Sequence, residues 1–576
     1  KPTQRRSMRP TPPPRKHWQT NPPSLPHSQI LTVKHPMPES DSHLRDARNA
    51  RARSAAQTAA ETLSVQPTGI VQYRSRGRVL VIGGEEAQWL AARLEAPLHA
   101  EVLQTAGDDE PGVPTTPLGD RRIQICGHLG AFEIELGEVG RHNHQTLHAD
   151  LVVDLGLKPL ISAQLPPPGY WHFGREVPDL DAALLVLEDM VGTFEKPRYF
   201  AYDASICAHA RSGQNGCRRC IDACPAEAII SIGEQVEVNP NLCQGGGICA
   251  SVCPSGAMRY AYPGPGDTAE RVRLLLQSYT AAGGSDPSVL VVSDEDAAGL
   301  PELPANVLLV VVEELASVGH ELWFAALAWG ARRVILADGG SIPPNARAAL
   351  ETQLSFSHDL LDGMGYDTAA LNFADVSKLP SEALPAYTPA ATFAALDSKR
   401  ELAGLALGHL WQHAPQQTEH FPILPGAPYG RIRVDSAKCT LCMSCTSVCP
   451  AKALSAGDET PRIVFHESNC VQCSICANSC PERAITLEAR YLADPEKRRQ
   501  AVSLHEEPPF CCVSCGKPFA PRRAIDNILE KLSGHAMFQT ERARRRLKMC
   551  EDCRVADAVQ DTEAMQGGLF GNQPQH

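Results

Sequence analysis

The sequence has no long hydrophobic run. The longest, at residues 307–312, is far shorter than the roughly 18 apolar residues that a helix needs to span a bilayer. Aromatic residues make up only 5% of the chain, so we expect cores built mainly from Ala, Leu and Val. The net charge of -12 disfavours general nucleic-acid binding, although the first 53 residues are locally basic. The sequence therefore predicts neither a transmembrane segment nor a nucleic-acid partner.

Residue patterns typical of common enzymes are also missing. No paired catalytic carboxylates, Ser/His/Asp order or phosphate-cradling loop stands out. Gly83-Gly84 follows an apolar run, as in a dinucleotide-binding turn, but the full GxGxxG pattern is absent, and Glu85 and Glu86 would repel a pyrophosphate. We interpret this segment as a plain α/β turn. A flavin bound within residues 77–200 is kept as an alternative hypothesis, in which the chain is a flavin-containing oxidoreductase subunit.

Cysteine, in contrast, is abundant. The 21 cysteines lie in tight groups with spacings of two and three. Scattered cysteines would suggest a secreted disulfide framework, whereas this grouping is typical of metal ligation in a reducing compartment. We therefore expect a cytoplasmic metal-binding protein.

The length of 576 residues predicts several domains, and the expected fold class is a multidomain α+β protein. Residues 1–70 are rich in Pro, Arg, Ser and Gln without an apolar period, so we expect a disordered basic tail there. The rest of the chain is divided into six expected regions. Two small α/β units span residues 77–200 and 287–370, and two cysteine arrays span 201–262 and 431–490. A connector with one helix spans 375–430, and a C-terminal cysteine segment spans 505–556.

The two α/β units are predicted from alternating strands and helices. In the second unit this order favours a short parallel sheet, with a helix at 321–330 between its last two strands. The predicted strands are residues 78–82, 123–126, 131–136 and 151–155 in the first unit, and 289–293, 307–312 and 333–336 in the second; further helices are expected at 85–94, 179–192 and 398–411.

The second cysteine array is the strongest pattern in the chain. It contains two runs of the form Cys-x2-Cys-x2-Cys-x3-Cys-Pro. In such runs the first three cysteines bind one cubane through a tight loop and the fourth binds the neighbouring cluster, so the array predicts two [4Fe–4S] clusters. A zinc site needs only four ligands and fits these eight cysteines poorly. The expected ligands are Cys439, Cys442, Cys445 and Cys480 for one cluster, and Cys470, Cys473, Cys476 and Cys449 for the other.

The first array departs from this pattern twice. Its first half reads Cys-x9-Cys-x2-Cys-x3-Cys-Pro, because nine residues separate Cys207 from Cys217. A flexible loop of that size closes at modest entropic cost, so a [4Fe–4S] cluster is still expected. Its ligands would be Cys207, Cys217, Cys220 and Cys253.

In the second half, Gly246 occupies the position of the second cysteine. Three thiols are left for the fourth cluster: Cys224, Cys243 and Cys249. Three thiolates suit a [3Fe–4S] cluster, because one corner of the cube is absent. They also suit a [4Fe–4S] cluster with an open corner, and a third possibility is that the cluster has been lost and the thiols are vestigial.

A third cysteine set has a different character. It reads CxxCG followed far downstream by CxxC, which is typical of a tetrahedral zinc site with four thiolate ligands. We favour one Zn²⁺, with a further iron–sulfur cluster as the competing interpretation. A helix is expected at 523–532, between the two cysteine pairs. The expected ligands are Cys512, Cys515, Cys550 and Cys553.

With these motifs in hand, the chain resembles bacterial polyferredoxin-type proteins with two dicluster ferredoxin modules, at residues 207–254 and 439–481. The 287–370 unit resembles the delta-subunit domain of methyl-viologen-reducing hydrogenase through residues 313–319 and 321–336, although that family's cysteines are absent here. The layout also resembles large 4Fe-4S proteins associated with formate dehydrogenase systems of proteobacteria, through residues 195–217, 512–520 and 546–555. The resemblance implies redox protein partners of the formate dehydrogenase or hydrogenase type.

The main functional hypothesis is therefore an electron-transfer protein that relays single electrons through three or four clusters. The α/β units would serve as scaffolds or docking surfaces. An alternative is an accessory or maturation factor for a molybdenum or tungsten oxidoreductase. No residue is assigned a catalytic role.

Overall fold

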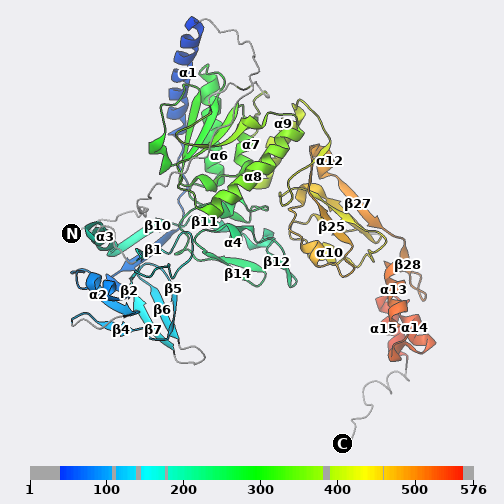
Figure 1. Cartoon of the computed structure of the whole chain (residues 1–576). Coiled ribbons are helices and arrows are strands. Elements are labelled where there is room, and N and C mark those ends of the chain that lie inside the picture. The colour runs from blue at the N-terminus through cyan, green and yellow to red at the C-terminus, as the bar shows by residue number, and fades with distance from the viewer. Residues whose placement is uncertain are drawn as a thin grey trace, which may run out of the picture.

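The computed structural model describes residues 39–106, 112–137, 144–174, 180–380, 384, 389–457 and 460–561. The described chain forms a mixed α/β protein in which the N-terminal α/β unit, the first cysteine array and the second α/β unit adjoin one another, and the second array lies beside them (Figure 1). The C-terminal segment extends beyond the second array. Among the described residues, no helix is long and apolar enough to cross a membrane.

The first described element is a helix, α1 (Glu39–Ala60). It packs along α6 (Pro265–Ala281), and the side chains of Ala52 and Ala56 are fully buried. Disorder was expected here, and that expectation is wrong for these residues. The alanines lie four apart on one helix face, so the Arg-rich helix is stabilised by tertiary contact and not by an apolar stripe of its own. Residues 1–38 of the expected tail lie outside the described residues.

The N-terminal α/β unit contains a five-stranded parallel sheet of order β4-β3-β2-β8-β9 and an antiparallel three-stranded sheet. The four strands predicted from the sequence are present, as are both helices, α2 (Glu85–Ala91) and α3 (Leu180–Asp189). The strands are β2 (Arg78–Gly83), β3 (His99–Gln104), β4 (Thr115–Pro117), β8 (Leu151–Asp154) and β9 (Tyr170–His172) in the first sheet, and β5 (Arg122–Cys126), β6 (Phe132–Gly137) and β7 (His144–Ala149) in the second.

Two features of this unit matter for the rest of the molecule. Its two ends are paired as an antiparallel stem, β1 (Ile70–Ser75) with β10 (Gly192–Pro197). In the turn after β2, the Glu86 carboxylate accepts the Gly84 N–H at 3.2 Å. A nucleotide phosphate would need that donor, so the contact favours a plain turn.

The second α/β unit is a four-stranded parallel sheet of order β18-β17-β19-β20, which confirms the predicted parallel arrangement. Helices α7 (His320–Ala328) and α8 (Pro344–Gly363) accompany it, and α9 (Lys399–Gln412) of the connector packs on α7. The sheet reaches beyond the expected limit at residue 370, because its fourth strand follows α8. The strands are β17 (Ser288–Ser293), β18 (Val307–Val312), β19 (Arg333–Asp338) and β20 (Leu371–Asp375).

Each cysteine array forms a small module of short hairpins and one-turn helices. The first module inserts a hairpin of β12 (Ala210–Arg211) and β13 (Gln214–Asn215) between its first two cysteines. Its other elements are β11 (Phe200–Tyr202) paired with β16 (Met258–Tyr260), β14 (Ile229–Ile232) paired with β15 (Gln235–Val238), α4 (Arg219–Ala223) and α5 (Ile248–Ser251).

The second module repeats this plan and adds a third strand to one hairpin. Connector strand β21 (His420–Pro422) pairs with β26 (Arg490–Leu492), and α12 (Pro495–Arg499) follows. The core elements are β22 (Arg431–Val434) paired with β25 (Ile485–Glu488), the sheet β23 (Leu454–Ala456), β24 (Arg462–His466) and β27 (Ala501–Glu506), α10 (Ser444–Ser447) and α11 (Ile475–Asn478).

The C-terminal segment begins with a hairpin of β28 (Pro509–Cys511) and β29 (Pro518–Pro521). Three helices follow, and the first confirms the helix expected at 523–532. They are α13 (Arg522–Leu532), α14 (Glu541–Arg546) and α15 (Glu551–Val559).

Candidate metal centres

The structure gathers the cysteines of the two arrays into four groups, which we name along the molecule. Each group collects thiols from two separate loops. Site A holds Cys224, Cys243 and Cys249; site B holds Cys207, Cys217, Cys220 and Cys253; site C holds Cys449, Cys470, Cys473 and Cys476; and site D holds Cys439, Cys442, Cys445 and Cys480.

The backbone of the cysteine loops explains how three neighbouring thiols converge. In the site C loop, Gln472 and Ser474 have φ angles of 54° and 69°. In the site D loop, Leu441 and Met443 have φ angles of 53° and 61°. Residues other than glycine rarely adopt this left-handed conformation, which turns the chain sharply between successive cysteines. A one-turn helix, α11 or α10, then begins at once.

Burial raises the pKa of several of these thiols. In site D it raises the pKa of Cys445 to about 12, and negative charge on the other three thiols adds to the rise. In site C it raises the pKa of Cys473 to about 11. Thiols in such pockets keep their protons unless a cation compensates the thiolate charge. The pockets therefore fit a metal-bearing group that brings its own positive charge.

Several sulfur atoms also accept hydrogen bonds. An amide N–H reaches Cys439 Sγ, Cys449 Sγ and Cys480 Sγ at 3.3–3.4 Å, and the Gln472 side chain donates to Cys470 Sγ at 3.3 Å. Such donors are among the features that set the potential of an iron–sulfur cluster. The donor set and its surroundings fit [4Fe–4S] clusters, whose irons would be held by these cysteines and would supply one-electron chemistry.

The nine-residue spacing between Cys207 and Cys217 in site B is accommodated by the β12–β13 hairpin. The Cys217 N–H donates to the Ala208 carbonyl at 2.8 Å, and the Gly216 N–H donates to the His209 carbonyl at 2.7 Å. These bonds close the loop, so the chain returns beside Cys207 before it reaches the next thiol. Burial raises the pKa of Cys217 to about 11 and of Cys220 to about 12. The insertion thus leaves the four thiols of site B together.

Site A keeps the cysteine-loop backbone although it lacks one thiol. Gly245 and Gly247 have φ angles of 86° and 70°, at the positions that Gln472 and Ser474 hold in site C. Gly246 therefore stands where site C has Cys473. A Cβ on Gly246 would meet only the Pro225 side chain, at 3.9 Å, so there is room for a side chain.

Both α/β units cover site A. From the N-terminal unit, the Leu165 N–H donates to the Pro225 carbonyl at 2.9 Å, and Lys196 Nζ donates to the Cys243 carbonyl at 2.6 Å. From the second unit, Ser317 lies so close that a Cβ on Gly247 would come within 2.5 Å of its Cα. Both α/β units therefore wall site A, whose three cysteines are half-buried, whereas Cys442 in site D is exposed.

The two modules meet through sites B and C. Asn478 Nδ2, on the helix of the site C loop, donates to the Asn215 carbonyl in the β12–β13 hairpin at 2.9 Å. Arg400 of α9 lies half-buried between the modules. Its guanidinium donates to the Pro254 carbonyl at 3.4 Å and to the Cys470 carbonyl at 3.2 Å. Pro254 directly follows Cys253 of site B, and Cys470 belongs to site C.

The C-terminal cysteines form a separate group. Their four Sγ atoms lie within 4.8 Å of one another, and the Sγ atoms of Cys515 and Cys550 are 3.7 Å apart. A tetrahedral ion with metal–sulfur bonds of about 2.3 Å separates its ligands by about 3.8 Å, so the group fits a single metal ion. Gly516 has a φ angle of 76°, which turns the knuckle back toward the metal position. The prediction that these four cysteines form one group is confirmed.

Two protein families match the regions that contain these sites. The 4Fe-4S dicluster domain family matches residues 438–484, and the 4Fe-4S binding domain family matches residues 236–259. These are iron–sulfur domains. The second match includes Gly246, so the family pattern is recognisable where one thiol is missing. No curated protein matches the chain significantly. The ferredoxin-type domains support iron–sulfur electron transfer as the general function.

Proposed function

We propose that the chain relays single electrons through its clusters in the order A, B, C, D. The observation that carries this order is the contact between the loops of sites B and C described above. Within each module the sites are also neighbours: Cys220 and Cys253 of site B influence the pKa of Cys249 in site A, and Cys445 of site D influences that of Cys476 in site C. Clusters held by these loops form one continuous series.

In this proposal, sites B, C and D hold [4Fe–4S] clusters and site A holds a [3Fe–4S] cluster. The retained backbone turn, the open space at Gly246 and the convergence of three half-buried thiols support an occupied site A over a vestigial one. The walls that both α/β units supply make site A the inner end of the series. Site D, with the exposed Cys442, is the outer end. The C-terminal group holds a structural zinc ion that clasps the segment.

The proposed partner is the catalytic subunit of a redox enzyme in the cytoplasm. The resemblance stated above points to a formate dehydrogenase-type system. Stable co-purification with such a subunit at fixed stoichiometry would exclude the rival role as a maturation factor. Purification as a free protein, with no redox subunit attached, would favour the rival.

The relay is tested by low-temperature EPR of the anaerobically purified full chain, before and after dithionite, with iron, sulfide and zinc analysis. We expect an oxidised-state [3Fe–4S] signal, broad spin-coupled signals after reduction and about one zinc per chain. Sharp, uncoupled reduced signals would contradict the continuous series. No oxidised-state signal would mean that site A does not hold a [3Fe–4S] cluster. No reduced signal at all would contradict electron transfer itself.

A further inference from the structure

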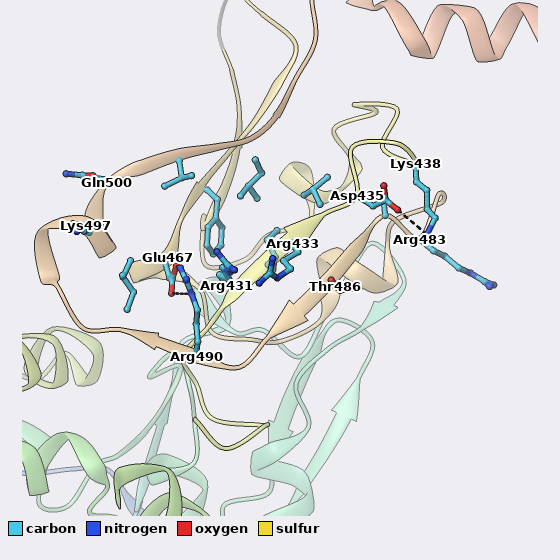
Figure 2. Close-up of a pocket in the computed structure, with 17 residues that line it drawn as sticks. Arg431, Arg433, Asp435, Lys438, Glu467, Arg483, Thr486, Arg490, Lys497 and Gln500 are labelled. Carbon is cyan, nitrogen blue, oxygen red and sulfur yellow. Dashed lines mark hydrogen bonds and ion pairs between the residues drawn. The ribbon is translucent and has the colours of Figure 1, made fainter. Parts of the chain in front are cut away.

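A basic recess opens on the surface of the second module. It lies between the β22–β25 pair and the strands β24 and β27, and its volume is about 570 Å³ (Figure 2). Apolar side chains from these strands, including the half-exposed Val502, form part of its wall. Six cationic residues line it: Arg431, Arg433, Lys438, Arg483, Arg490 and Lys497.

The cations of the recess outnumber the carboxylates that pair with them. Glu488 is shared by Arg431 and Arg433, and the two guanidiniums lower its pKa to about 2. One positive charge is therefore left over at this pair. Arg483 makes no ion pair with any described residue, so it adds a second uncompensated charge.

The other three cations are each balanced by one carboxylate. The pairs are Lys438 with Asp435 at 3.2 Å, Arg490 with Glu467 at 2.6 Å, and Lys497 with Glu419 at 2.9 Å. Six cations against four carboxylates leave the recess with an excess of two positive charges. On a chain whose net charge is -12, this is a local reversal of sign that attracts anions.

The cations are spread along the recess. Figure 2 shows Arg490 and Lys497 toward one end, Lys438 and Arg483 toward the other, and Arg431 and Arg433 between them. A compact anion such as a phosphate reaches only one of these groups at a time. Several carboxylates carried on one extended segment can reach all of them. The spread of the cations along the recess therefore favours an acidic polypeptide segment as the bound partner.

The recess also adjoins site D. Lys438 directly precedes the ligand Cys439, and Arg483 lies three residues after the ligand Cys480. Ala484, which lines the recess, donates its N–H to Cys480 Sγ at 3.3 Å. A molecule bound here lies next to the outer end of the proposed cluster series.

We propose that this recess is the docking surface for a carboxylate-rich segment on a redox partner protein, which exchanges electrons with site D. The electron exchange rests on the proposed relay, whereas the docking does not. Charge complementarity of this kind steers the encounter of electron-transfer partners and is weakened by salt.

Docking is tested with a fluorescein-labelled decaglutamate peptide and the oxidised, cluster-loaded full chain, by fluorescence anisotropy at low ionic strength. We expect binding that weakens about tenfold in the double variant Arg433→Gln/Arg483→Gln and falls steeply with added salt. The matched control is Arg74→Gln/Arg122→Gln, which removes two exposed arginines from the N-terminal unit and leaves binding unchanged. Equal binding by both double variants, or no binding at all, overturns the proposal.

A competition experiment separates an acidic segment from a small anion. Unlabelled decaglutamate should displace the probe at a much lower total carboxylate concentration than citrate does. Equal displacement by citrate would identify a small-anion site and overturn the docking of a protein segment.

A redox experiment tests whether the bound segment lies at site D. The dithionite-reduced chain is oxidised by tris(oxalato)cobaltate(III), which takes one electron per Co(III) to give Co(II). Decaglutamate should slow this reaction in the wild type and have little effect in Arg433→Gln/Arg483→Gln. Equal slowing in both would contradict the placement at site D. Failure of dithionite to reduce any cluster would contradict the relay and leave the anisotropy result for docking intact.

Discussion

Gly216 and Ile475 are in direct contact across the two ferredoxin modules. A Cβ on Gly216 would come within 2.5 Å of Ile475 Cγ1, a distance that packed side chains do not tolerate. Gly216 directly precedes Cys217 of site B, and Ile475 lies between Cys473 and Cys476 of site C. A Cβ would also come within 2.6 Å of the Ala208 carbonyl oxygen, so the absence of a side chain at Gly216 is needed both within the site B loop and for the approach of the two cluster loops.

Substitution Gly216→Ala should separate the loops. We expect it to destabilise the chain by about 1–3 kcal/mol, the usual range for overpacking, and to weaken the spin coupling between sites B and C while iron content is kept. EPR of the reduced protein and iron analysis measure both effects. Gly404→Ala is the control, because a Cβ there meets nothing within 4 Å. Unchanged coupling in Gly216→Ala would mean that the B–C contact does not set the distance between the clusters.

Substitution Gly246→Cys should give site A a fourth thiolate. The position has room for the side chain, and the loop already has the required turn. We expect the oxidised-state [3Fe–4S] signal to disappear and about one more iron to bind per chain. Gly246→Ala adds a Cβ without a thiol and should keep the signal. An unchanged signal in Gly246→Cys would show that the residue does not face the cluster.

Substitution of the neighbouring Gly247 should destabilise the chain, unlike substitution of Gly246. A Cβ at this position would come within 2.5 Å of the Ser317 backbone, and its φ angle of 70° disfavours other residues. We expect Gly247→Ala to lower the urea midpoint of unfolding and to reduce the iron content of site A, whereas Gly246→Ala leaves both close to wild type. Similar midpoints for the two variants would contradict the close packing of the second α/β unit against site A.

Arg400 should be required for the junction between the modules. Its guanidinium donates to four carbonyl groups in three segments, so Arg400→Met would leave buried acceptors without partners and cost about 2–3 kcal/mol. Arg400→Lys keeps the charge but lacks the forked donor geometry, so it should recover stability only in part. Urea unfolding compares the variants, and EPR follows the B–C coupling. Full recovery by lysine would show that charge alone is needed.

Removal of the metal ion proposed for the four C-terminal cysteines should unfold the C-terminal segment and leave the rest of the chain folded. Chelation, or the substitution Cys550→Ser, should make residues 505–561 sensitive to limited proteolysis, because folding and metal binding are coupled in small four-cysteine segments. The spectra of the iron–sulfur clusters should not change. Zinc released in step with cleavage would support the assignment, and iron released instead would identify an iron site. The substitution Cys511→Ser is the control, since Cys511 is outside the four-thiol group.

The cysteine spacing was sufficient to predict most of what surrounds the metal sites. Thiol ligands of cubane clusters must follow one another in tight loops, so the spacing alone identifies the loops. Parallel strands buried on both faces read as continuous apolar runs, which is why β17, β18 and β19 were predicted. Weakly apolar elements such as α1 were missed, because their burial depends on small residues facing a partner far along the chain.

The junction of the modules was not predictable from local pattern either. Arg400 lies in a connector whose composition indicates only a helix, and its partners belong to segments distant in sequence. The basic recess combines residues from five strands and a helix, so no sequence window contains it. In the sequence, Gly216 is recognisable only as part of the lengthened segment between Cys207 and Cys217. Tertiary contacts of this kind carry no local periodic signal.

The stem formed by β1 and β10 has a consequence for the order in which the molecule is made. Both of its strands, and with them the whole N-terminal unit, precede the first proposed cluster ligand, Cys207, in the chain. Domains generally fold as units from the N-terminus during translation, and the wall that supplies Leu165 and Lys196 is synthesised before any thiol of site A. The opposite wall at Ser317 is translated only after all three thiols. The two walls of site A are thus translated on either side of its three thiols, so the pocket proposed for the cluster is complete only after the second α/β unit has folded.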